Sequence, residues 1–156
     1  MIKNIYKLVL LSAIFFAVNL CSANAQTVMG SIGNGTFAPG KTVKATVVLS
    51  LPGDLHANSR YPGSAYAIPT TVTARGNGLR IGAVSYPRGK NRKFEFSSDT
   101  INVYEGRTTF KFDVTVPANY TRKTISVRVK VKYQACTNEV CYPPKTKDIT
   151  LTARSQ

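Results

Sequence analysis

The 156-residue sequence contains no tryptophan, one histidine (His56), and seven acidic residues against 21 basic ones. A single histidine excludes every site that needs two imidazoles, including most catalytic zinc centres and the His-Glu-x-x-His metalloprotease motif. With only seven carboxylates in the chain, a hydrolase that works through a pair of carboxylates has few candidate residues. His56 opens a predicted strand, with no nearby cysteine and no Ser-His-Asp order in evidence, so we interpret it as a surface or partly buried residue without a catalytic role.

Hydrophobic residues make up 43% of the chain and charged residues 18%, which is typical of a globular protein and not of a disordered basic tail. A chain of this length buries enough apolar surface in one core to fold unaided. We therefore expect a single domain, once the N-terminal segment is set aside.

Residues 1–25 have the three parts of a Sec-type signal peptide. Lys3 and Lys7 form a positive region, residues 8–20 are mostly apolar, and Ala23-Asn24-Ala25 predicts cleavage before Gln26. The apolar stretch is too short for a membrane span of about 20 residues. A retained anchor or a lipoprotein modified at Cys21 is a less favoured alternative, and we expect a periplasmic or secreted protein.

Cleavage of this segment changes the net charge and the number of cysteines. The formal net charge falls from +14 to +12, because Lys3 and Lys7 are the charged residues that are lost. Cys21 is lost as well, so Cys136 and Cys141 remain as a pair in a compartment where disulfides form.

Alternating apolar and polar residues predict half-buried antiparallel strands along much of residues 26–156. Turn signals such as Pro39-Gly40, Gly76-Asn77-Gly78 and Glu105-Gly106 separate these runs. About seven to nine short strands favour an all-β fold, an immunoglobulin-like antiparallel β-sandwich over residues 26–156. The clearest alternating runs are residues 43–50, 110–116, 125–134 and 149–153, with shorter candidates at 67–74, 79–85 and 101–104.

Cys136 and Cys141 lie in the predicted hairpin loop between a strand ending near Gln134 and the last strand, which begins near Lys147. As a structural staple, so small a ring stabilises by only about 2 kcal/mol, against about 4–5 kcal/mol for a ring of a hundred residues. As a redox pair, one thiolate attacks a partner's disulfide and the other resolves the mixed disulfide. Two thiolates with one imidazole in the whole chain make a poor metal site, so we expect neither metal nor cofactor.

The run from Tyr133 to Pro144, YQACTNEVCYPP, resembles the active-site loop of the N-terminal periplasmic domain of the thiol-disulfide interchange protein DsbD. Residues 55–70 and 86–106 are similar to other parts of that domain family. The resemblance spans about residues 52–152, although four residues separate the two cysteines here, where the best-known members have five.

The resemblance implies an immunoglobulin-like domain that passes reducing equivalents to exported thiol proteins. It implies that Cys141 forms mixed disulfides and Cys136 resolves them, and that a cap aromatic, for which Tyr86 and Phe94 are candidates, shields the pair. A thioredoxin-like partner or membrane thiol relay would supply the electrons. Because the sequence ends at Gln156, we expect that donor to be a separate protein.

A non-catalytic exported binding module with a structural loop disulfide remains the alternative function, and whether the chain is an enzyme stays open. Tyr133 and Tyr142 flank the cysteine loop and are candidates for a docking surface, although Tyr133 is equally well explained as the last inward residue of its strand. The sequence leaves the oligomeric state open.

Basic residues fall in two groups, the first of which we expect on an exposed loop and the second on the solvent face of a strand. An exported chain argues against nucleic acid and favours peripheral contact with an anionic membrane surface or an acidic protein. A solvated face that serves solubility is an equally good interpretation. The two groups are Arg88, Lys90, Arg92 and Lys93, and Arg128, Lys130 and Lys132.

Overall fold

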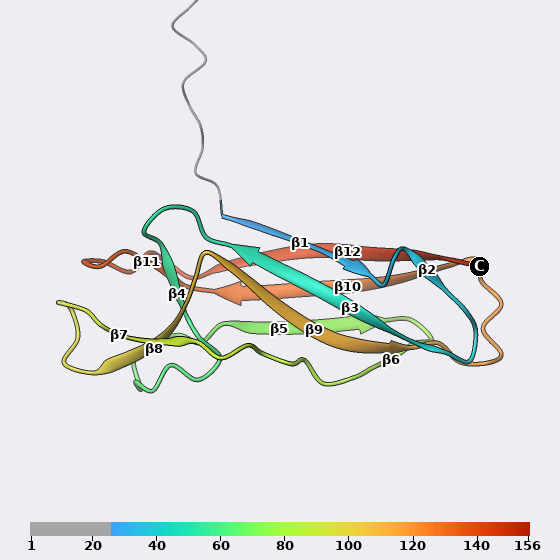
Figure 1. Cartoon of the computed structure of the whole chain (residues 1–156), viewed down its shortest axis with the longest axis horizontal. Helices are drawn as coiled ribbons and strands as arrows, with labels where there is room; N and C mark the ends of the chain where they lie inside the picture. The colour runs from blue at the N-terminus through green and yellow to red at the C-terminus, as the bar shows by residue number, and fades with distance from the viewer. Residues whose placement is uncertain (1–25) are drawn as a thin grey trace, which may run out of the picture.

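The computed structural model describes residues 26–156, and the predicted signal peptide, residues 1–25, lies outside the described part. Within that part all regular structure is β, and no helix is long and apolar enough to cross a membrane. The strands form three four-stranded sheets (Figure 1). They are β1 (Thr27–Ile32), β2 (Thr36–Phe37), β3 (Thr42–Ser50), β4 (His56–Asn58), β5 (Thr71–Gly76), β6 (Arg80–Ile81), β7 (Lys90–Lys93), β8 (Thr100–Glu105), β9 (Arg107–Thr115), β10 (Thr124–Tyr133), β11 (Ala135–Cys136) and β12 (Lys145–Ser155).

Two of the sheets, with strand orders β1-β3-β9-β6 and β2-β12-β10-β5, enclose the hydrophobic core. Their strands pair antiparallel except for the short parallel contact between β2 and β12. Strand β10 shows the alternation most clearly, because every second residue is buried and the residues between are exposed. Its inward side chains are Ile125, Val127, Val129, Val131 and Tyr133.

The third sheet, with order β11-β4-β8-β7, extends one end of this sandwich. Strand β8 runs into β9 through Gly106, whose φ of 60° is a left-handed conformation that favours glycine. Strand β4 follows β3 after the Pro52-Gly53-Asp54 turn, and β11 follows β10 after Gln134. Continuations of both main sheets therefore pair directly at β4 and β11.

The all-β immunoglobulin-like class predicted from the sequence is confirmed, and the four clearest alternating runs coincide with β3, β9, β10 and β12. The expectation that the first basic group lies on an exposed loop is wrong for Lys90, Arg92 and Lys93, because these residues belong to β7. All four residues of β7 are exposed, so the segment has no apolar alternation from which a strand could be predicted. Antiparallel pairing with β8 holds it in the sheet.

Candidate functional site

Cys136 and Cys141 form a disulfide within a tight hairpin of their own. Their α-carbons lie 4.0 Å apart, and the two residues face each other as an antiparallel bridge. Backbone hydrogen bonds flank the bridge on both sides, since Thr137 N–H donates to the Val140 carbonyl (2.8 Å) and Tyr142 N–H donates to the Ala135 carbonyl (2.9 Å). The backbone thus holds the two sulfur-bearing residues together through bonds that involve no sulfur.

The turn that closes this hairpin is stabilised by the side chain of Thr137. Its Oγ1 accepts hydrogen bonds from the N–H groups of Glu139 (3.2 Å) and Val140 (3.1 Å). On the other side, Gln134 Nε2 donates to the Tyr142 carbonyl (3.1 Å). A threonine that accepts from the backbone two and three residues ahead is a local turn former, which explains why this short segment folds back on itself.

The two cysteines differ in exposure. Cys136 is 0% exposed, whereas Cys141 is partly exposed and lines a cavity of about 300 Å³ together with Tyr66 and Phe96. Both of those aromatic side chains are themselves exposed, as is Tyr142 next to Cys141. Of the two cysteines, Cys141 is therefore the one that is accessible to solvent.

The interpretation of His56 as a surface or partly buried residue is wrong, because it is buried, and a cysteine that was not evident from the sequence lies opposite it. In the third sheet His56 on β4 lies directly opposite Cys136 on β11, and it is only 3% exposed. Residues that are 80 positions apart in the chain meet because β4 and β11 are neighbours, which alternation alone does not reveal. The Nε2 atom of His56 has no hydrogen-bond partner within residues 26–156, and such a buried polar atom calls for a functional or structural explanation.

An aromatic stack covers His56. The Phe94 ring is stacked on the imidazole with a centroid distance of 4.2 Å, and Phe96 is stacked on Phe94 at 5.2 Å. Both phenylalanines lie in the loop between β7 and β8, so this loop reaches over the cysteine end of the sheet. Of the two cap candidates, Phe94 thus stacks on His56, the residue opposite Cys136, while Tyr86 packs edge-on against Phe110 (5.6 Å) and hydrogen-bonds to the Val72 backbone.

In the third sheet His56 lies between Cys136 on one side and Glu105, the β8 residue opposite it, on the other. Hydrogen bonds from Arg92 lower the pKa of Glu105 to about 2, with burial opposing and Lys90 adding to the effect. Burial lowers the pKa of His56, an effect that the Glu105 carboxylate opposes and Arg92 reinforces. The imidazole beside Cys136 is accordingly held in its neutral form near neutral pH.

The structure also decides whether Tyr133 can belong to a docking surface. Tyr133 is fully buried in the core and donates a hydrogen bond to Gln26 Oε1 (3.2 Å), so it is unsuited to a docking surface. Sequence reasoning missed Phe96 and Glu105. The only signal for the first was the Phe-x-Phe repeat at residues 94–96, and there was none for the second. No three His, Cys, Asp or Glu residues in the described range 26–156 lie close enough together to hold a metal ion.

Comparison with known proteins places this geometry in a family context. Residues 34–153 match the family model described as "Thiol:disulfide interchange protein DsbD, N-terminal". No curated protein matches the chain.

Among solved structures, the N-terminal periplasmic domain of ScsB from Proteus mirabilis is similar, with a TM-score of 0.53 and 11% identity. The alignment covers 88% of this chain and 49% of that one, so this chain spans about half the length of that structure. The yeast GGA1 GAE domain is also similar (TM-score 0.48, 10% identity, 85% of this chain and 94% of that chain). So is a chain of the Coh-OlpA cohesin–dockerin complex from Clostridium thermocellum (0.46, 11%, 83% and 99%).

At 11% identity the likeness to the ScsB domain shows a shared fold and nothing finer. The family match is broader, because it covers most of the sequence and includes Cys136, Cys141 and His56. The chain belongs to the family of DsbD N-terminal domains.

Proposed function

We propose that this protein exchanges thiols and disulfides with partner proteins through Cys136 and Cys141. The observation that carries the proposal is the hairpin, which keeps the two α-carbons 4.0 Å apart by backbone hydrogen bonds on either side of the pair. When the S–S bond is broken, those bonds keep the thiols adjacent, and the pair closes again without any movement of the core. A two-electron carrier requires this property.

The exchange proceeds in two balanced steps. The Cys141 thiolate attacks a partner's disulfide, forming a mixed disulfide and releasing one partner sulfur as a thiolate. Cys136 then loses its proton and its sulfur attacks Cys141 Sγ, which releases the second partner sulfur and leaves the Cys136–Cys141 disulfide. The partner gains two electrons, and an external dithiol restores the reduced pair by the reverse sequence.

The difference in exposure supports this division of roles. Cys141 is partly exposed and lines a cavity, while Cys136 is fully buried. An incoming disulfide reaches Cys141 first, and only the mixed disulfide, already attached at Cys141, comes within reach of Cys136. The family resemblance assigns the same roles to the two positions.

Exposed apolar side chains surround Cys141 and suit it for docking another protein. Tyr66 and Phe96 share its cavity, and Val140 and Tyr142 are its neighbours in the chain. Large side chains exposed to solvent around a reactive sulfur are typical of a contact surface. We place this exchange outside the cytoplasm, with exported thiol proteins as partners and a thioredoxin-like protein or membrane relay as the electron donor.

A trapping experiment tests the proposal. The Cys136→Ala variant lacks the resolving sulfur, so it is expected to accumulate mixed disulfides through Cys141 that dithiothreitol releases on non-reducing gels. The matched Cys141→Ala variant retains only the buried Cys136 and is expected to trap far less. If Cys136→Ala is well expressed and traps nothing, the proposal fails, and the alternative of a non-catalytic binding module with a structural loop disulfide is favoured.

A further inference from the structure

The outer face of the sheet β2-β12-β10-β5 carries a dense group of cations. Strand β10 projects Arg128, Lys130 and Lys132 from alternate positions, and all three are exposed. Arg75 of β5 lies directly opposite Arg128. The ion pair between Lys130 and Asp148 of β12 is long, at 3.8 Å, and both side chains are more than half exposed.

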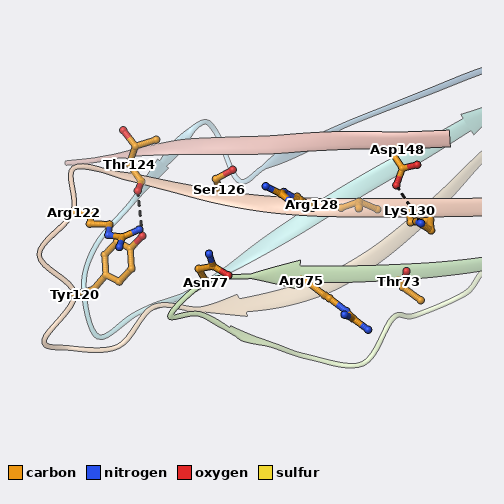
Figure 2. Close-up of a pocket in the computed structure, with 11 residues that line it drawn as sticks. Thr73, Arg75, Asn77, Tyr120, Arg122, Thr124, Ser126, Arg128, Lys130 and Asp148 are labelled. Carbon is orange, nitrogen blue, oxygen red and sulfur yellow. Dashed lines mark hydrogen bonds and ion pairs between the residues drawn. The ribbon is translucent and has the colours of Figure 1, made fainter.

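A groove of about 720 Å³ runs over this face (Figure 2). Its cations are Arg75, Arg122, Arg128 and Lys130, and Asp148 is the single acidic residue among the described residues that line it. Neutral hydrogen-bonding side chains stand between the cations. They are Thr73, Asn77, Tyr120, Thr124 and Ser126.

The groove has one counter-charge among its described lining residues, Asp148, which pairs with Lys130 and leaves the three arginines without an ion-pair partner within residues 26–156. Like charges placed directly opposite each other on paired strands destabilise a sheet, and Arg75 and Arg128 occupy such positions. The four ion pairs of the described chain include neither of them, nor Arg122. A bound anion would remove this repulsion, so the arrangement suits binding better than it suits stability.

We propose that this cationic face, defined by Arg75, Arg122, Arg128, Lys130 and Lys132, binds the phosphate headgroups of an anionic membrane surface. Guanidinium groups bind phosphate through paired hydrogen bonds, and the neighbouring hydroxyl and amide groups add donors for its further oxygens. The cations extend along β10 beyond the groove, which matches an array of phosphates better than one small ligand.

The chemistry of this face also argues against a typical protein partner. The exposed large hydrophobic side chains of the described residues are Met29, Tyr61, Tyr66, Phe96, Val140 and Tyr142, and none of them lines the groove. Protein contacts gain most of their affinity from buried aromatic and apolar anchors, whereas peripheral attraction to lipid headgroups needs only charge.

The groove of the cationic face and the cysteine pair lie apart. The β9–β10 connection, which supplies Tyr120 and Arg122 to the groove, is at the opposite end of β10 from β11 (Figure 1). A molecule held on a membrane by this face therefore leaves Cys141 free to react. The proposal does not depend on the redox function, because it requires no chemistry at the cysteines.

Co-sedimentation with vesicles tests the proposal. The protein is expected to bind vesicles of phosphatidylcholine and phosphatidylglycerol but not of phosphatidylcholine alone, and added salt should weaken the binding. Each cation near such a surface contributes about fivefold in affinity, so the variant Arg75→Gln/Arg122→Gln/Arg128→Gln should bind roughly a hundredfold more weakly.

The matched control is Lys41→Gln/Arg80→Gln/Lys111→Gln, which removes the same net charge from exposed positions outside the groove and outside every described ion pair. It should retain most of the binding, and any contribution of residues 1–25 is common to both variants. An equal loss in both variants, or no binding to anionic vesicles, overturns the proposal. Binding to polyglutamate but not to vesicles also overturns it, and assigns the face to an acidic protein.

Discussion

Reduction of the Cys136–Cys141 disulfide is expected to lower the free energy of unfolding by only about 2 kcal/mol, because the ring spans a sequence separation of five. Closing so short a loop removes little conformational entropy from the unfolded chain. Domains of this size are generally stable by about 5–15 kcal/mol, so the reduced protein should remain folded.

The structure gives a second reason for this small effect. The main hydrophobic cluster is built from other side chains, and it includes neither the partly exposed Cys141 nor Cys136, which is buried outside it. The hydrogen bonds of Thr137 and Tyr142 that flank the pair persist when the sulfurs separate. Reduction therefore removes a cross-link from the unfolded state and little from the folded one.

Urea denaturation of the oxidised and the reduced protein measures the difference directly. The double variant Cys136→Ala/Cys141→Ala serves as a control that lacks the cross-link under any conditions, and it should resemble the reduced protein. A loss above about 4 kcal/mol would refute the reasoning, because a ring of this size cannot supply it. A lower denaturant slope would refute it too, since it would show that reduction loosens the fold.

Acid is expected to destabilise the fold, because the unfolded state binds protons more readily than the folded state at two groups. The free energy of unfolding should fall below pH 6.5, because His56 takes up a proton in the unfolded state and resists it in the folded state. It should fall again between pH 4.5 and about 2, where the Glu105 carboxylate is protonated in the unfolded state before it is in the folded one. Denaturation across this pH range checks both steps, and His56→Phe should abolish only the first. Phe94→Ala should speed reduction of the disulfide by dithiothreitol and cost about 1 kcal/mol for each lost ring stack, whereas Tyr61→Ala, at a position 79% exposed, should change neither. Thr137→Val removes the acceptor of two turn hydrogen bonds, so the turn that brings the two thiols together forms less readily. If the disulfide loses about 1 kcal/mol of stability relative to the dithiol, a redox-buffer titration should give a reduction potential about 20 mV less negative.

The sandwich strands were predictable because their burial follows a simple period. In β10, apolar residues at every second position from Ile125 to Tyr133 all point inward, as the alternation predicts. Strand β7 gave no such signal, because Lys90–Lys93 is exposed throughout and is held only by pairing with β8. Alternation of apolar and polar residues indicates a strand with one buried face, so it cannot predict a strand such as β7 that has none.

The candidate site was predictable only where its residues are close in the chain. Cys136 and Cys141 could be recognised because five positions separate them. The contact of β4 with β11 brings His56 opposite Cys136, and the β7–β8 loop brings Phe94 onto His56. These contacts depend on how the strands bend out of the main sandwich, near Gly106 for example, and the amino-acid pattern does not encode that path in any local run.

The reduction potential of the Cys136–Cys141 pair tests the central claim most directly. Equilibration of the purified protein with dithiol redox buffers, followed by quantification of free thiols, gives this value. A pair that carries electrons should have a potential above about −300 mV, within reach of thioredoxin-like donors. A potential below that value would identify a structural disulfide and contradict the account.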